Sequence, residues 1–337
     1  MSRRTTWGRA LSMLTGVVLI AATLAPPAGA DVSPQVRQAV TAGLDNLKEH
    51  QNEDGSWPGH YGESPGVVGI ILLAFFAHGE VPGRGPYKET IDKALDFILA
   101  CAQDDGLISR TGAAPMYNHG FATLALAEAY GMSKRPKIER ALRKAVDLIV
   151  RTQNTRGGWR YQPRPADDDI TVTGCQLVAL RAAANAGINV PRKTIEKGLD
   201  YIESCYAYGG FAYTPGGAPG AARTGIGALV LQLLGREDNE KVTKGIEYIK
   251  NNPPRHPGSY FYYATYYCAQ AMYQYGGAEW KAWDRDVTEQ LLRLQIKSGT
   301  ERGSWPETGA AGGKHYATAM ALLALEVSWR YLPIYQR

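Results

Sequence analysis

The chain has 337 residues and a formal net charge of +5, with 37 lysines and arginines against 32 aspartates and glutamates. Three of the arginines fall in residues 1–30, where no acidic residue occurs, so the remainder is close to neutral. Because no basic cluster or basic helical face stands out, the composition argues against nucleic acid and against an anionic membrane surface as partners.

Residues 1–30 have the pattern of a secretory signal peptide. Arg3, Arg4 and Arg9 precede an apolar run over residues 11–24, and small residues follow at 28–30. A basic start, a short apolar stretch and an A-x-A end are typical of such signals. The run is shorter than the ~20 residues that a membrane span needs. We therefore expect an exported protein, periplasmic or extracellular, that is not membrane-spanning and whose mature domain is residues 31–337.

From residue 34 onward, amphipathic helices recur about every 50 residues. Each carries a small residue, an aliphatic residue and an acid in succession, with apolar side chains three and four positions apart, which indicates one core-facing helical face. The five copies are Gly43-Leu44-Asp45, Ala94-Leu95-Asp96, Ala145-Val146-Asp147, Gly198-Leu199-Asp200 and Gly245-Ile246-Glu247.

Each of these helices ends in a polar turn with glycine and a large side chain. Glycine accepts the left-handed backbone that terminates a helix, and glutamine can hydrogen-bond free backbone groups there. An aromatic ring then folds back over the turn. The six turns are residues 51–57, 103–107, 153–159, 209–211, 258–260 and 303–305.

A much less polar helix follows each turn. Aligned with one another, these helices share one column of Val68, His119, Thr173, Thr224, Thr265 and Thr318, and a next column of Gly69, Gly120, Gly174, Gly225, Tyr266 and Ala319. A glycine inside a helix costs about 1 kcal/mol relative to alanine. Four of them therefore indicate helices that must approach one another closely.

Six such pairs predict an all-α fold, an (α/α)6 toroid in which apolar inner helices are ringed by amphipathic outer helices. An open solenoid is the rival architecture, but it would need polar capping repeats, and neither end looks like one. The four cysteines, Cys101, Cys175, Cys205 and Cys268, have no metal-binding spacing. We expect four free, mostly buried thiols, no bound metal and no cofactor.

The turns and the helix pairing resemble the prenyltransferase and squalene-oxidase repeat superfamily, which includes triterpene cyclases and protein prenyltransferase β subunits. Gln51, Gly55 and Trp57 match its Q-x-x-x-G-x-W motif, as do residues 153–159. Residues 295–305 are a looser copy with an insertion. The resemblance covers residues 33–335 and implies the toroid fold, whereas it is weak for activity.

By this resemblance, residues 166–171 lie where triterpene cyclases carry a D-x-D-D-T motif with the catalytic acid. If Asp168 and Asp169 match its last two acids, Ala166 replaces the first acid and Ile170 the threonine. The resemblance thus implies Asp168 or Asp169 as a proton donor. The alternative is that Asp169 caps a helix N-terminus, where acids are stabilising.

Prenyltransferase β subunits of the superfamily bind zinc through aspartate, cysteine and histidine. His315 stands where that histidine would, but the preceding repeat has no Asp-x-Cys. A lone histidine cannot make a tetrahedral zinc site, so we exclude this activity.

In a toroid of this kind the starts of the inner helices converge on one face, which we call the mouth. A polar and aromatic rim above an apolar floor is typical of a small-ligand pocket. The rim residues that we expect to bind a ligand are Tyr117, Asn118, His119, Thr171, Arg223, Tyr262, Tyr263, Tyr266, His315 and Tyr316. Alternatively the histidines and tyrosines only pack, and Arg223 pairs with Asp169.

Three functions stay open. The first is an exported toroid that binds a small apolar or glycan-like ligand, or a protein partner, in its mouth without intact family catalytic motifs. The second is an enzyme: a reduced cyclase with Asp168 or Asp169 as acid, or a glycan-active toroid in which His119 and Asp169 act together. The third is a structural role, which predicts a lumen filled by side chains.

Overall fold

The computed structural model describes residues 32–59, 63–110, 112–164, 166–309, 313–329, 332 and 334, so the expected signal peptide lies outside the described residues. The described residues form twelve α-helices and two short strands. The helices are α1 (Pro34–Glu49), α2 (Pro65–Ala77), α3 (Lys88–Ala100), α4 (Pro115–Ser133), α5 (Pro136–Thr152), α6 (Ile170–Asn185), α7 (Arg192–Ser204), α8 (Ala221–Leu233), α9 (Glu240–Asn251), α10 (Phe261–Tyr275), α11 (Gly277–Leu294) and α12 (Gly313–Leu325).

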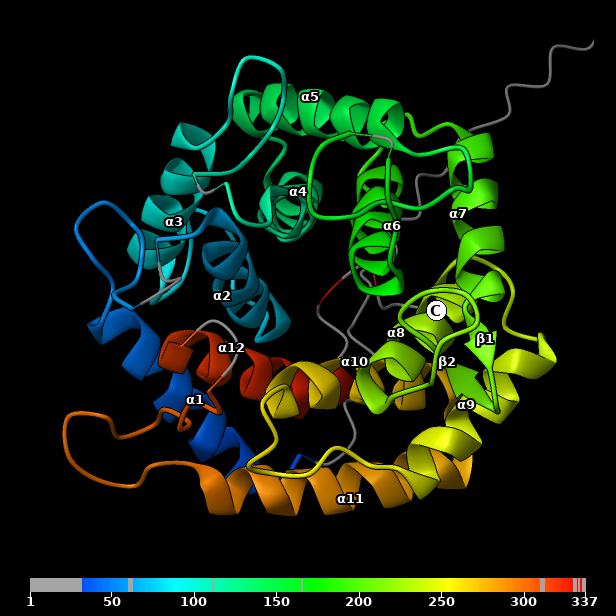
Figure 1. The fold of residues 1–337 in the computed structure, drawn as a ribbon. Helices are drawn as coiled ribbons and strands as arrows, with labels where there is room; N and C mark the ends of the chain where they lie inside the picture. Colours follow the sequence, from blue (N-terminus) through cyan, green and yellow to red (C-terminus); the bar gives the residue numbers. More distant parts are fainter. Residues whose placement is uncertain are drawn as a thin grey trace, which may run out of the picture.

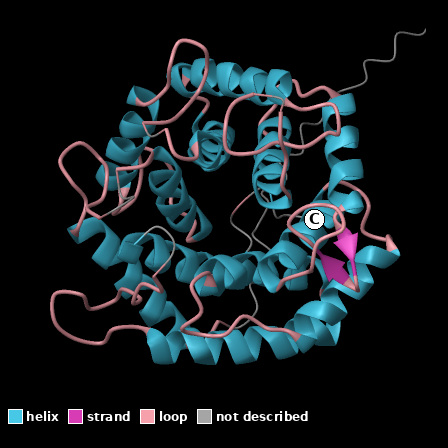
Figure 2. Cartoon of the chain, viewed as in Figure 1, coloured by secondary structure: helices cyan, strands magenta, loops and turns pink. Residues whose placement is uncertain are grey.

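The helices alternate between an outer and an inner ring. Odd-numbered helices run around the outside, and even-numbered helices surround the centre (Figure 1). Colouring by secondary structure shows that helices form both rings almost entirely (Figure 2). Every residue of inner helix α2 is buried, whereas outer helix α9 buries only Val242, Gly245, Ile246 and Ile249. The all-α toroid with apolar inner helices is therefore confirmed.

The last turn closes the ring against the first helix. Gln295, at the end of α11, donates from Nε2 to the Ala39 carbonyl in α1 at 2.7 Å and to the Gly303 carbonyl at 2.9 Å. Asn46 of α1 donates to the Arg302 carbonyl at 3.1 Å. Because these bonds join residues some 256 positions apart, the chain forms a closed ring and the open solenoid is wrong.

The glutamine of each Q…G…W turn joins two successive outer helices. Gln153 donates from Nε2 to the Gly157 carbonyl within the turn and to the Thr194 carbonyl of α7, both at 2.9 Å. Trp159 closes the same turn, because its Nε1 donates to the Ile149 carbonyl at 2.8 Å. The first turn has the same bonds through Gln51 and Trp57. The motif is thus a hydrogen-bonded clamp between neighbouring repeats.

The turn glycine lies directly on the next outer helix. Gly157 has φ +95°, and a Cβ there would clash with the Lys197 carbonyl oxygen of α7. Gly303 has φ +92° and stands in the same relation to the Ala42 carbonyl of α1. Both the left-handed backbone and the close approach require glycine.

The inner helices approach one another through the aligned glycines, as expected. A Cβ on Gly69 of α2 would lie 2.7 Å from the Phe121 carbonyl oxygen of α4, and one on Gly225 of α8 would lie 2.8 Å from the Cys268 amide of α10. In four of the six repeats, the residue of the column before the glycines accepts a hydrogen bond from a backbone amide of the turn. Thr173 accepts from the Trp159 amide through Oγ1 at 3.0 Å.

The fourth turn differs from the others because it forms a hairpin. Strands β1 (Tyr206–Ala207) and β2 (Gly210–Phe211) pair antiparallel, with Tyr208 and Gly209 at positive φ between them. All four cysteines are free and buried, as expected. Among the described residues, no helix is both long and apolar enough to cross a lipid bilayer.

A buried carboxyl, that of Glu128, contacts Ile334 at the end of the toroid opposite the mouth. Glu128 of α4 is 3% exposed, and its Oε1 accepts from the Ile334 amide at 3.3 Å. Burial raises the pKa of Glu128 to about 8. Glu128 is therefore un-ionised in the folded protein at pH 7.

Glu128→Gln should change how stability depends on pH. In the unfolded wild type, Glu128 ionises near its ordinary pKa of 4.5, whereas in the folded protein it keeps its proton up to about pH 8. Between these two pH values the unfolded state loses a proton that the folded state retains. Glu128 therefore lowers the free energy of unfolding as pH rises through this range. Glutamine does not titrate, so the free energy of unfolding of the variant relative to the wild type should increase from pH 4.5 to pH 8. Urea unfolding at several pH values measures it, with Glu49→Gln on exposed α1 controlling for one lost charge. Parallel pH profiles of the free energy of unfolding in Glu128→Gln and wild type would contradict a buried, un-ionised Glu128.

Candidate functional site at the mouth of the toroid

The candidate site surrounds Asp169, which precedes inner helix α6. Asp169 has the extended backbone of an N-cap, φ −149° and ψ 159°, and its side chain is fully buried. Its Oδ1 accepts from the Thr171 and Val172 amides at 2.8 and 2.9 Å. The cap that the sequence suggested is therefore present.

The two oxygens of Asp169 have different surroundings. Oδ1 also accepts from the Thr171 hydroxyl, whereas Oδ2 has no hydrogen bond of regular geometry within the described part of the chain. Burial raises the pKa of Asp169, and the hydrogen bonds from Thr171, Val172 and the nearby Tyr213 hydroxyl oppose that shift. Asp169 is thus a buried carboxyl whose Oδ1 is held by three donors, whereas no donor holds Oδ2 in regular geometry among the described residues.

A short chain of hydroxyls leads to Asp169 from the neighbouring inner helix. Tyr117 of α4 donates to Thr171 Oγ1, and the Thr171 hydroxyl donates to Asp169 Oδ1. Tyr263 of α10 lies close enough to Tyr117 for each to affect the pKa of the other, but its hydroxyl has no hydrogen bond of regular geometry among the described residues. Tyr117 and Tyr263 are half-buried, unlike most inner-helix residues. The structure thus brings together Tyr117, Thr171, Tyr263 and Asp169 from three inner helices.

Further tyrosines pack around this group. The Tyr263 and Tyr266 rings lie 4.9 and 4.8 Å from the ring of Tyr267. Burial raises the pKa of the Tyr316 hydroxyl well above its ordinary range. Tyr262 packs against Phe261 at 4.9 Å, and its hydroxyl is buried without a partner among the described residues. The mouth is therefore aromatic, with the tyrosine hydroxyls un-ionised.

Two tyrosines next to Asp169 were missed from the sequence. The hydroxyls of Tyr161 and Tyr213 lie 2.5 Å apart, and the Arg160 guanidinium lies 5.3 and 5.8 Å from their ring centres. Each tyrosine stands two residues after its turn aromatic, Trp159 or Phe211. That shared position was the signal that could have found them.

The surroundings of Asp168 favour a structural role over the expected role of proton donor. Both of its oxygens accept from the Arg156 guanidinium at 2.8 Å, and Oδ2 also accepts from the Asn154 amide. Its side chain is fully buried in this bidentate ion pair. Such bidentate pairs are strong and geometrically specific. Asp168 therefore fastens the third turn.

His119 occupies the position that threonines take in the other repeats and bonds to its turn in the same way, which argues against a catalytic role. It stands in the column of threonines, and its Nδ1 accepts from the Ile108 amide at 3.1 Å while Nε2 lies 3.1 Å from the Ala145 carbonyl. Burial lowers the pKa of His119 to about 4. With one backbone donor and one backbone acceptor, the ring is held as the neutral Nε2–H tautomer, and neither nitrogen is left for a substrate.

Three other expected ligand residues have their contacts away from Asp169. The Asn118 carbonyl oxygen accepts from Ser64, the N-cap of α2. Arg223 donates to the Pro219 carbonyl at 3.4 Å, and within the described residues it forms no ion pair with Asp169. His315 packs its ring 5.5 Å from His50 of α1, and burial lowers its pKa to about 4. These three residues thus lie outside the group around Asp169, although the buried Nδ1 of His315 has no hydrogen-bond partner among the described residues.

The chemistry that these side chains offer is acid–base chemistry. Over the ranges that the structure describes, no three histidine, cysteine, aspartate or glutamate side chains are grouped to hold a metal ion. What the arrangement provides is one buried acid with a raised pKa, surrounded by un-ionised tyrosines.

No protein-family model matches the chain. Over 148 residues it is 28% identical to a drimenyl diphosphate synthase of Streptantibioticus cattleyicolor, and the match covers 43% of this chain and 27% of that protein. The chain thus spans about a quarter of the length of this curated relative.

Two solved structures share the fold. The type II terpene cyclase MstE from Scytonema, in complex with merosterolic acid A, has a TM-score of 0.59 at 15% identity over 87% of this chain and 97% of that one. The α-1,6-mannanase GH76A of Salegentibacter sp. HEL1_6, in complex with α-1,6-mannotriose, has a TM-score of 0.62 at 10% identity over 86% and 98%. The toroid and the resemblance to terpene-cyclase proteins are confirmed, and at these identities the structures bear on fold alone.

Proposed function

We propose that the protein is an acid-initiated enzyme of terpene-cyclase type, in which Asp169 protonates an apolar polyene bound in the mouth. The observation that carries the proposal is the Asp169 carboxyl. It is buried, its pKa is raised, and Oδ2 lacks the hydrogen bonds that hold Oδ1. The sequence similarity to a drimenyl diphosphate synthase supports the same class of chemistry.

The surroundings suit this reaction. Protonation of a carbon–carbon double bond needs a carboxylic acid that keeps its proton, and burial provides this by disfavouring the charged form. The proton passes from Asp169 to one carbon of the substrate, leaving a carboxylate and a carbocation. Tyrosine rings stabilise a nearby cation through their π faces, and the mouth supplies Tyr117, Tyr263 and Tyr267. Loss of a proton from the cation ends the reaction.

Ligand binding without catalysis is the alternative that the defective D-x-D-D-T motif favours. A glycan-active enzyme is supported less, because its acid–base pair would need His119, whose two ring nitrogens contact the backbone. Because the N-terminal segment has the pattern of a signal peptide, we further propose that the reaction takes place outside the cytoplasm, on an apolar ligand and without a cofactor.

Incubating the purified protein with linear polyprenyl alcohols and polyprenyl diphosphates, followed by mass spectrometry of the extracts, tests the proposal. Cyclic products with the mass of the substrate or of its hydrate are the expected result. Saturable binding of the same polyenes without any product would favour the non-catalytic alternative instead.

Thr171→Val should raise the pKa of Asp169 while leaving the helix cap in place. Valine has nearly the same shape as threonine but cannot donate to Oδ1, and a lost hydrogen bond to the charged form disfavours that form. The two backbone amides at 2.8 and 2.9 Å remain. Titration of the carboxyl carbon by NMR measures the shift. An unchanged or lowered pKa would show that the Thr171 hydroxyl does not act on this carboxyl.

A further inference from the structure

A cavity lies at the opposite end of α6 from Asp169. It has a volume of about 470 Å³ and lies between the end of α6, the start of α7 and the end of α8. Since α6 rises about 1.5 Å per residue, Ala184 in this cavity is on the order of 20 Å from the mouth. This size is within the ~300–1,000 Å³ typical of small-molecule sites. We call it the base groove.

The floor of the base groove is apolar. It consists of Leu180 from α6, Ile195 and Leu199 from α7, and Val190 and Leu234 from the adjoining loops. Leu180 and Leu199 are buried, while Ile195 is half-buried and so presents part of its side chain to the groove. Such a floor accommodates an aliphatic chain.

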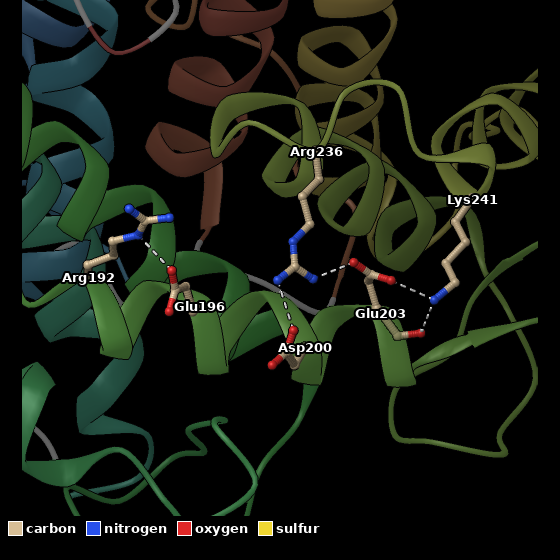
Figure 3. A network of polar contacts seen from close by, with 6 residues as sticks. All are labelled: Arg192, Glu196, Asp200, Glu203, Arg236 and Lys241. Atoms are coloured by element: carbon tan, nitrogen blue, oxygen red, sulfur yellow. Dashed lines mark hydrogen bonds and ion pairs between the residues drawn. The ribbon is translucent and has the colours of Figure 1, made fainter.

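The rim of the base groove carries three arginines, two of which are paired with carboxylates. Arg181, Arg192 and Arg236 line it, against a single carboxylate from Glu196. Arg192 pairs with Glu196 on the same helix, with Nε 2.6 Å from Oε1, and Figure 3 shows this pair at the start of α7. Both partners are exposed, and surface pairs of this kind are weak.

Arg236 forms a fixed wall of the groove. It points down between Asp200 and Glu203 of α7, and Lys241 reaches the other oxygen of Glu203 (Figure 3). The Arg236–Asp200 and Lys241–Glu203 distances are both 2.8 Å. This network connects α7 to the segment after α8. The charge of Arg236 is therefore compensated by Asp200 and Glu203 and is not available to a ligand.

Arg181 is the charge that remains available. It is exposed near the end of α6, beside the apolar floor, and forms no ion pair or hydrogen bond within the described ranges of the chain. The start of α7 faces the same rim, and a helix N-terminus favours negative charge. A carboxylate at Arg181 would thus meet positive potential from the side chain and the helix together.

We propose that the base groove binds a single-chain anionic amphiphile, a fatty-acid-like carboxylate. Its aliphatic chain lies against the half-buried Val190, Ile195 and Leu234, above the buried Leu180 and Leu199, and its carboxylate pairs with Arg181. The groove shares no residue with the Asp169 group, so the site does not depend on the proposed enzymatic function.

Calorimetric titration of the full chain with dodecanoate, below its micelle concentration, tests the proposal. Arg181→Gln should weaken binding at least about fivefold, because it removes a charge-assisted hydrogen bond. Ile195→Gln, checked for folding by its melting temperature, should weaken dodecanoate and dodecanol alike. Glu196→Gln should strengthen dodecanoate binding by releasing Arg192. Arg37→Gln on distant α1 removes the same charge and should change nothing.

Equal affinity for dodecanoate in Arg181→Gln and wild type would overturn the proposal. So would dodecanol binding as tightly as dodecanoate, because the rim would then contribute no charge recognition. Binding to vesicles that contain phosphatidylglycerol, without saturable binding of monomeric dodecanoate, would assign the rim to a lipid surface and would equally overturn it.

Discussion

Asp169→Asn should abolish conversion of a polyene substrate while leaving the toroid folded. General acids typically contribute ~10²–10⁴-fold to rate, and the asparagine amide is far too weak an acid to protonate a double bond. Its side-chain oxygen still accepts from the Thr171 and Val172 amides, so the cap of α6 survives. Product formation by mass spectrometry, thermal melting and direct binding of the polyene together separate loss of chemistry from loss of structure.

Asp168→Asn is the matched control for this experiment. The neutral side chain loses its bidentate ion pair with Arg156, so the variant should melt at a lower temperature but still form product. A folded Asp168→Asn protein without turnover, or an Asp169→Asn protein with full turnover, would contradict the assignment of the acid. In the second case, retained polyene binding would identify the mouth as a non-catalytic site.

The active wild type should also lose activity as pH rises. Asp169 must carry its proton to act, and burial raises its pKa. The rate is then greatest below that pKa and falls as pH increases through it. Thr171→Val, which raises the pKa further, should move the fall to higher pH. A rate that increases with pH over this range would exclude a carboxylic acid as the proton donor.

Gly303→Ala should destabilise the protein by about 3–5 kcal/mol, at the upper end of single-substitution effects. The residue has φ +92°, which costs an alanine ~1–2 kcal/mol. The added methyl group would also clash with the Ala42 carbonyl of α1. Because this turn closes the ring, relief of the clash would separate α1 from the last repeat. Urea unfolding followed by circular dichroism measures the loss.

Gly187→Ala isolates the contribution of the backbone. Gly187 has φ +93°, almost the same as Gly303, but no described atom lies within 4 Å of the Cβ that would be added. We expect this control to cost only the ~1–2 kcal/mol of a left-handed alanine. Equal losses in the two variants would show that the contact with α1 does not contribute to closure of the ring.

The fold could be predicted from the sequence because its repeat signals act over short distances. Trp159 bonds to a carbonyl ten residues earlier and Gln153 to one four residues later. Such contacts leave their residues at fixed spacing, so Q…G…W recurs visibly along the chain. The glycine column was similarly readable, since a glycine inside a helix has few reasons other than close packing.

The candidate site was only partly predictable. The sequence placed Asp169, Thr171, Tyr117 and Tyr263 at one mouth because they follow equivalent turns. It could not decide which of Asp168 and Asp169 is the candidate acid. Nor could it show that His119, in a column of threonines, bonds to the backbone rather than to a ligand. His119 contacts Ala145, 26 positions away, and Tyr117 contacts Thr171, 54 positions away. No spacing rule in one sequence records such pairs.

The sequence by itself thus determined the helix pairs, their number and the glutamine, glycine and tryptophan that hold the repeated turns, since these depend on hydrogen bonds and packing within or next to one repeat. Only the tertiary structure decided which polar side chains remain available at the mouth and at the base groove. A side chain's charge and reactivity depend on burial and on partners from other repeats. The ion pair of Asp168 and the open Oδ2 of Asp169 therefore became distinguishable only when the ring was closed.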